Sequence, residues 1–136
     1  MENNYIELLQ TGNYTLIVVN GELRTFTRRG VTDLYSLLKD TPEFLQGASV
    51  VDKVVGKAAA ALMIIGGVKE LHADVISAGA LGLLNMSDLH VNYSQSIPHI
   101  MNRSGNGWCP LEELCNDCRT AQECYQKISS FIDNQN

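Results

Sequence analysis

The sequence is short of basic side chains and of long apolar runs. Its 136 residues include 10 lysines and arginines against 15 aspartates and glutamates, which gives a net charge of -5. Proteins that bind DNA, RNA or an anionic membrane usually carry clustered positive charge, so we expect no nucleic-acid polymer and no membrane as partner. The longest nearly pure apolar run is 58–68. It is far shorter than a transmembrane helix, which needs about 20 apolar residues.

Cysteine is absent from most of the chain. All four cysteines fall in its last quarter, at Cys109, Cys115, Cys118 and Cys124. Residues 1–4 also lack the basic segment that opens a secretory signal, and no apolar segment follows them. We therefore expect a cytoplasmic protein whose thiols are reduced or bind metal, rather than a disulfide framework.

The chain does have enough apolar material for one hydrophobic core. Hydrophobic residues make up 45% of the sequence, which suits a single domain over 1–136 with a cysteine-containing helical tail over 109–136. An alternative function of the protein is that of an interaction module. In that case the edge of a hairpin or the apolar helices would pair two subunits as a homo-oligomer.

Turn signals and apolar periodicity predict alternating helices and strands. Asn20-Gly21, between the β-rich segments 14–19 and 22–27, indicates a hairpin. Asp52 is expected to cap an apolar helix that runs from 53 to about 65 and ends at Gly66-Gly67. The other expected elements are a helix over 3–10, a helix capped by Thr32 or Asp33, a strand over 71–76, a helix over 78–86, a strand over 89–93 and a helix from Pro110. This order predicts an α/β fold with parallel pairing after the hairpin.

Two segments carry a resemblance to a known family. They are VVDKVVGKAAA at 50–60 and NRSGNGWCPLE at 102–112. Together they resemble a small prokaryotic family of uncharacterised function with the cytidine-deaminase-like fold, over roughly 3–114. The resemblance implies a three-layer α/β/α architecture, with a mixed sheet that includes the N-terminal hairpin.

Zinc chemistry is disfavoured by the residues at two places. Active deaminases hold zinc with an H-x-E segment at the start of the central helix and a P-C-x-x-C segment at the start of the next one. The corresponding slots here, 52–58 and 76–80, contain neither His nor Cys. We therefore expect no bound metal, no cofactor and no zinc-dependent deamination. A displaced site that combines His72 with the cysteine tail is the one arrangement that would restore zinc.

Charged and small residues at the same helix start suggest a ligand site. Lys53 and Lys57 lie four apart, on one face of the expected helix, and a helix N-terminus attracts anions. The proposed ligand is small and anionic or nucleotide-like. The plainer interpretation is a solvated capping aspartate beside two surface lysines. The candidate ligand-binding residues are Asp52, Lys53, Lys57, Asn102, Arg103, Gly105 and Gly107.

The cysteines leave several alternatives open. Cys109 precedes Pro110 at a helix start and is a candidate nucleophile of a metal-independent enzyme, with Glu112 as the acid or base; the alternative is a packed or capping cysteine. The other three cysteines cannot converge on one continuous helix, but a capping box at 120–123 predicts a break. With such a break the three thiols can approach one another. The alternatives are a metal site, a redox pair such as Cys118 with Cys124, and free packed thiols.

Overall fold

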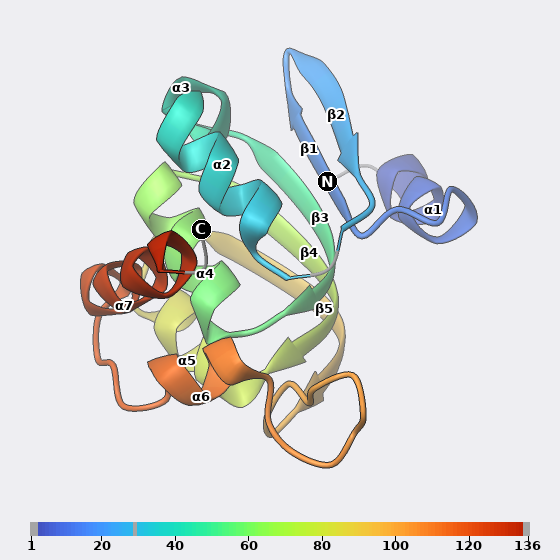
Figure 1. Ribbon diagram of the computed structural model, residues 1–136. Helices are drawn as coiled ribbons and strands as arrows, with labels where there is room; N and C mark the ends of the chain where they lie inside the picture. The colour runs from blue at the N-terminus through green and yellow to red at the C-terminus, as the bar shows by residue number, and fades with distance from the viewer. Residues whose placement is uncertain (1–2, 29, 135–136) are drawn as a thin grey trace.

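The computed structural model describes residues 3–28 and 30–134, so the expectation of no secretory signal falls partly outside the described residues. The described chain forms a mixed α/β structure around a five-stranded sheet of order β2-β1-β3-β4-β5 (Figure 1). The strands are β1 (Leu16–Asn20), β2 (Glu22–Phe26), β3 (Ser49–Val55), β4 (Glu70–Ser77) and β5 (His90–Ile97). β1 pairs antiparallel with both β2 and β3, whereas β3, β4 and β5 run parallel. The expected hairpin and parallel pairing are both confirmed.

The start of the central helix is where the sequence-based expectation was wrong. Asp52 and Lys53 belong to β3, and the helix, α4 (Lys57–Gly66), begins only after Gly56. Residues 49–55 are rich in valine and are held extended by β1 on one side and β4 on the other, so tertiary pairing decides their conformation. Asp52 therefore caps no helix, and Lys53 and Lys57 do not share a helical face.

The ends of other elements follow the expected signals in part. Gly67 ends α4 in the left-handed conformation, at φ +77°, which suits glycine. α2 (Thr32–Asp40) has no side-chain cap: the residue before it is Val31, and neither Thr32 nor Asp33 takes that role. β5 extends beyond the expected 89–93. Its side chains are polar and mostly exposed, so the sequence lacks the alternation of a half-buried strand that would have revealed its full length.

Helices cover the two faces of the sheet unequally. α1 (Asn3–Thr11) lies alone against one face, where Leu9 packs with Ile17 and Val51 (Figure 1). The larger core, on the other face, includes α4 with residues of the remaining helices. These helices are α2, α3 (Pro42–Leu45), α5 (Ala78–Asn85), α6 (Pro110–Cys115) and α7 (Ala121–Asp133). None of the helices in the described chain is long and apolar enough to cross a membrane.

The tail breaks where the capping box predicts. α6 ends at Cys115, and α7 restarts after Thr120, whose hydroxyl oxygen accepts a hydrogen bond from the Glu123 amide at 3.1 Å. The two helices therefore form a bent pair that packs against α4, rather than one rod.

A substitution at Leu62 measures how much the core around α4 contributes to stability. Its side chain is completely buried, so Leu62→Ala should lower the free energy of unfolding by about 2–5 kcal/mol, through lost apolar burial and the cavity left behind. Urea denaturation followed by circular dichroism measures this loss. Leu23→Ala, at a side chain that is 43% exposed, is the matched control and should change stability far less.

Candidate functional site

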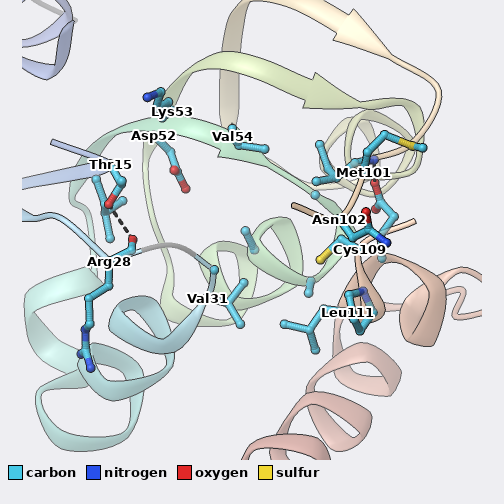
Figure 2. Close-up of a pocket in the computed structure, with 18 of the residues that line it drawn as sticks. Thr15, Arg28, Val31, Asp52, Lys53, Val54, Met101, Asn102, Cys109 and Leu111 are labelled. Atoms are coloured by element: carbon cyan, nitrogen blue, oxygen red, sulfur yellow. Dashed lines mark hydrogen bonds between the residues drawn. The ribbon is translucent and has the colours of Figure 1, made fainter. Parts of the chain in front are cut away.

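A cavity of about 620 Å³ opens where β3 ends and α4 begins (Figure 2). In sheets with parallel strands, ligands bind outside the carboxyl ends of the strands, and this cavity has that position relative to β3. Its walls come from the end of β3, the first turn of α4, the residues that flank the hairpin and α2, and the segment 100–112. The two segments that carry the family resemblance therefore meet at one cavity.

Asp52 is the buried acid of the cavity. Its side chain is 8% exposed, and Figure 2 shows the carboxyl directed into the cavity while the Lys53 ammonium points away from it. Burial raises the pKa of Asp52 to about 8, although hydrogen bonds from the Val54 and Lys53 backbone act in the opposite direction. None of the ion pairs found in the described residues includes this carboxyl. Asp52 is therefore an uncharged acid at neutral pH, able both to donate and to accept a hydrogen bond.

The first turn of α4 offers backbone donors to the cavity. Ala58 and Ala59 line it, and amides in the first turn of a helix have no carbonyl partner within that helix. The preceding amide, at Lys57, is already occupied, because it donates to Glu112 Oε1 at 3.0 Å. The start of α4 can thus offer the Ala58 and Ala59 amides to a negatively charged or polar ligand atom in the cavity.

Cationic side chains lie at the rim. Arg28 donates from Nε to Asp33 Oδ1 at 3.0 Å, so its charge is partly compensated by a buried aspartate. Arg103 and Lys53 also line the cavity, and both side chains are exposed. The rim therefore keeps positive charge around an uncharged acid, despite the net negative charge of the chain.

Glu112 is buried and joins three parts of the chain beside the cavity. Its carboxylate accepts hydrogen bonds from the Lys57 amide, from Ser77 Oγ at 3.2 Å and from the Ile100 amide at 2.6 Å. These donors belong to the start of α4, the end of β4 and the segment before α6. The geometry gives Glu112 a positioning role, since both of its oxygens are already engaged.

Cys109 lines the cavity and is half-buried. Its amide donates to the Ile100 carbonyl at 2.8 Å, which fixes the backbone just before α6. None of the three histidines lines the cavity; His99, the nearest in sequence, stacks on Trp108 with ring centroids 3.5 Å apart. The fold therefore brings no histidine into the cavity that could act as a base for Cys109.

The cavity gathers most, but not all, of the candidate residues. Asp52, Lys53, Asn102, Arg103, Cys109 and Glu112 line it. Lys57 does not: its ammonium donates to the carbonyls of Asn116, at 3.1 Å, and of Cys118. Gly105 and Gly107 lie outside the lining as well, in a loop closed by the paired amide side chains of Asn102 and Asn106.

Several lining residues escaped the sequence analysis. Thr15, Arg28, Val31 and Asp33 come from the first quarter of the chain, outside both resembling segments. The Thr15 hydroxyl donates to the Arg28 carbonyl at 2.7 Å and so joins the two ends of the hairpin beside the cavity (Figure 2). These residues come close to Asp52 only through the sheet order, which puts β1 next to β3. No local sequence pattern predicts that order.

A displaced zinc site at His72 does not form. Leu71 and Ala73 face the larger core, and side chains alternate along a strand, so His72 points to the opposite face of the sheet. The cysteine tail belongs to the larger core, which leaves the sheet between the two. No group of three or more potential metal ligands able to hold an ion occurs in the residues that the structure describes.

Comparison with known proteins places the chain in a family. Residues 4–132 match the family described as TM1506, a domain of unknown function (DUF1893). The chain belongs to the DUF1893 family. A solved structure of a DUF1893 family protein (TM1506) from Thermotoga maritima is 27% identical, with a TM-score of 0.86 over 94% of this chain and 87% of that one. No curated protein matches the chain. The similarity thus supports the overall fold of this DUF1893 protein and assigns no activity.

The Asp52 carboxyl should make stability depend on pH. The unfolded group ionises near its ordinary pKa of 3.8, whereas the folded group keeps its proton to about 8, so the free energy of unfolding should fall as pH rises between these values. The slope is at most about 1.4 kcal/mol per pH unit. Asp52→Asn should flatten this dependence in urea denaturation at pH 5 and pH 7.5, whereas Asp117→Asn, at an exposed acid, should leave it unchanged. Parallel curves for wild type and Asp52→Asn would contradict the assignment.

Proposed function

We propose that this DUF1893 protein binds a small anionic or nucleotide-like ligand in the cavity at the end of β3. The observation that carries the proposal is the convergence of a buried, uncharged acid, the first turn of a helix and the exposed Arg103 side chain on one cavity of about 620 Å³. Ligand pockets of this size are mostly apolar and carry a few convergent polar groups. An interaction module with a filled pocket fits this open cavity less well.

The fold relationship that we propose is to the cytidine deaminases, without their zinc chemistry. The slot for the H-x-E segment, 52–58, contributes Asp52 and the first turn of α4 to the cavity. At the slot for the second segment, Ser77 caps α5 by accepting from the Ala80 amide at 3.2 Å and also donates to Glu112. These groups do not fit a zinc ion that needs imidazole or thiolate ligands. The proposed ligand therefore binds to the protein directly.

The chemistry of the ligand follows from the donors and acceptors. A protonated carboxyl presents a donor beside an acceptor, which complements the adjacent donor and acceptor atoms on the edge of a nucleobase or an amide. The Ala58 and Ala59 amides and the Arg103 side chain favour a phosphate or carboxylate at the other part of the ligand. A nucleoside monophosphate combines both features and is the simplest probe of the class.

Calorimetric titration with the common nucleoside monophosphates, their nucleosides and inorganic phosphate tests this proposal. We expect at least one nucleotide to bind, with an affinity that falls as pH rises through about 8, where Asp52 loses its proton. Arg103→Ala should weaken binding about tenfold or more, because one hydrogen bond to a charged group contributes about 1.5–3 kcal/mol. Asp52→Ala, which removes an uncharged donor and acceptor, should weaken binding about fivefold, since a neutral hydrogen bond contributes about 1 kcal/mol.

Arg119→Ala is the control for charge, since Arg119 is exposed in the α6–α7 turn and lies outside the cavity lining. Equal weakening by Arg119→Ala and Arg103→Ala would mean that binding responds to overall charge and not to this site. The absence of binding by every nucleotide, nucleoside and phosphate would overturn the proposal.

Cys109 gives the cavity a second, catalytic candidate function. Its thiol is the one in the described chain that lines the cavity, where it could attack a bound ligand as a nucleophile. The rate of alkylation by iodoacetamide at pH 7 decides the point: a reactive nucleophile should alkylate at least about tenfold faster than a free thiol with its ordinary pKa of about 8.5. An ordinary rate leaves ligand binding without covalent chemistry as the proposal.

A further inference from the structure

One flank of the molecule, formed by α5 and β5, is almost free of charge. β5 is the last strand of the sheet, and no further strand of the described chain pairs with its outer edge. α5 connects β4 to β5 and packs against α4. Residues 75–98 include one aspartate, Asp88, and no glutamate, lysine or arginine, whereas 18% of the whole chain is charged. A surface that meets only water normally carries more charge than this flank does.

The two edges of the sheet differ in their protection. Exposed edge strands can pair with another chain, and proteins usually shield them by charge, proline or short length. β2, at one edge, has five residues and carries an ion pair between Arg24 and Glu22 at 3.5 Å. β5, at the other edge, has eight mostly exposed residues, and none of them is proline, aspartate, glutamate, lysine or arginine. Of the two edges, β5 is therefore the one left open to pairing.

Gly82 lies within α5 and is not explained by the packing of one chain. Glycine weakens a helix interior relative to alanine, so it is expected where another group approaches closely. A Cβ added at Gly82 would meet no atom of the described chain within 4 Å. Gly82 shares an exposed helical face with Ala78, four residues before it, and Asn85, three residues after it. This face is free of bulky side chains and can admit a second helix from outside the chain.

Tyr93 lies where β5 and α5 meet. It pairs with Ala73 of β4, whose side chain belongs to the larger core. Paired residues of adjacent strands lie on the same face of a sheet, so Tyr93 is on the face that carries α5. Its side chain is near the middle of the strand and is 46% exposed. Tyrosine is enriched at protein interfaces, and Tyr93 provides an apolar contact near the centre of this flank.

We propose that the flank of α5 and β5 joins two copies of the chain in a two-fold symmetric dimer. The two β5 strands pair antiparallel across an axis near Tyr93 and Ser94, so the two five-stranded sheets become one continuous sheet. The two α5 helices then meet on the same side of that sheet, where Gly82 allows them to approach closely.

The lack of charge favours a second copy over a different partner. A two-fold axis places each residue close to its own copy, so charged residues here would repel one another, and the neutral flank avoids this repulsion. A different protein would usually be recognised through complementary charge, which this flank does not offer. None of the residues 75–98 lines the ligand cavity, so the dimer leaves the cavity open, and association can be measured separately from ligand binding.

Sedimentation velocity of the full-length protein tests the dimer. We expect a species with twice the 15.0 kDa mass of one chain, which dissociates on dilution. Ser94→Lys, at an exposed residue of β5, places two like charges near the axis and should weaken association at least about tenfold. Leu23→Lys adds the same charge to an exposed position of β2, at the other edge, and should leave association unchanged.

Gly82→Gln separates association from folding. Glutamine favours a helix more than glycine does, and its side chain would enter open space in a single chain. In the Ser94→Lys background, where the chain is monomeric, Gly82→Gln should therefore raise the urea midpoint. Alone, it should weaken the dimer at least about tenfold, because the added side chain keeps the two α5 helices apart.

Three outcomes would contradict the dimer. The mass of a single chain at concentrations up to about 0.1 mM would overturn the proposal. So would dissociation in Leu23→Lys but not in Ser94→Lys, because it would assign the interface to the edge at β2. A dimer of unchanged affinity in Gly82→Gln would overturn the contact between the two α5 helices.

Discussion

The cavity of this DUF1893 protein depends on one buried carboxylate. Glu112 accepts from the first amide of α4, from the Ser77 hydroxyl and from the Ile100 amide, so one side chain ties the central helix, the end of β4 and the segment before α6. A buried carboxylate is stable only when its oxygens receive such donors, and each lost partner would leave an unsatisfied charge. Through these bonds the start of α4 and the segment 100–112, which both line the cavity, are held in fixed positions relative to each other.

The two acids of the cavity are used in opposite ways. Glu112 accepts hydrogen bonds from three donors and holds the fold together here, whereas Asp52 is buried, and burial favours its uncharged form. Keeping an acid in such surroundings costs stability at neutral pH, and proteins tend to keep unfavourable groups where binding or chemistry uses them. This contrast is the physical reason for placing the ligand at Asp52 and for treating Glu112 as a positioning residue.

Local signals predicted the elements better than they predicted the site. Asn20-Gly21 identifies the hairpin because a tight turn is encoded within two residues, and the capping box at Thr120 identifies the start of α7 for the same reason. Residues 49–55 become a strand only because β1 and β4 flank them, so the expected helical face that joined Lys53 to Lys57 does not exist. Most of the cavity wall could be found through the resembling segments at 50–60 and 102–112. The lining residues between 15 and 33 are brought there by sheet order, which one sequence does not reveal.

The bonds of Glu112 also bear on the order in which the protein matures during synthesis. Its three partners precede it by 55, 35 and 12 positions, so the hairpin, β3, α4 and β4 must all leave the ribosome before the residue that ties them. Until then the first amide of α4 and the Ser77 hydroxyl lack this acceptor. The cavity is thus among the last parts of the molecule to be completed, and a nascent chain that stalls just before residue 112 would carry the strands of the sheet and no finished cavity.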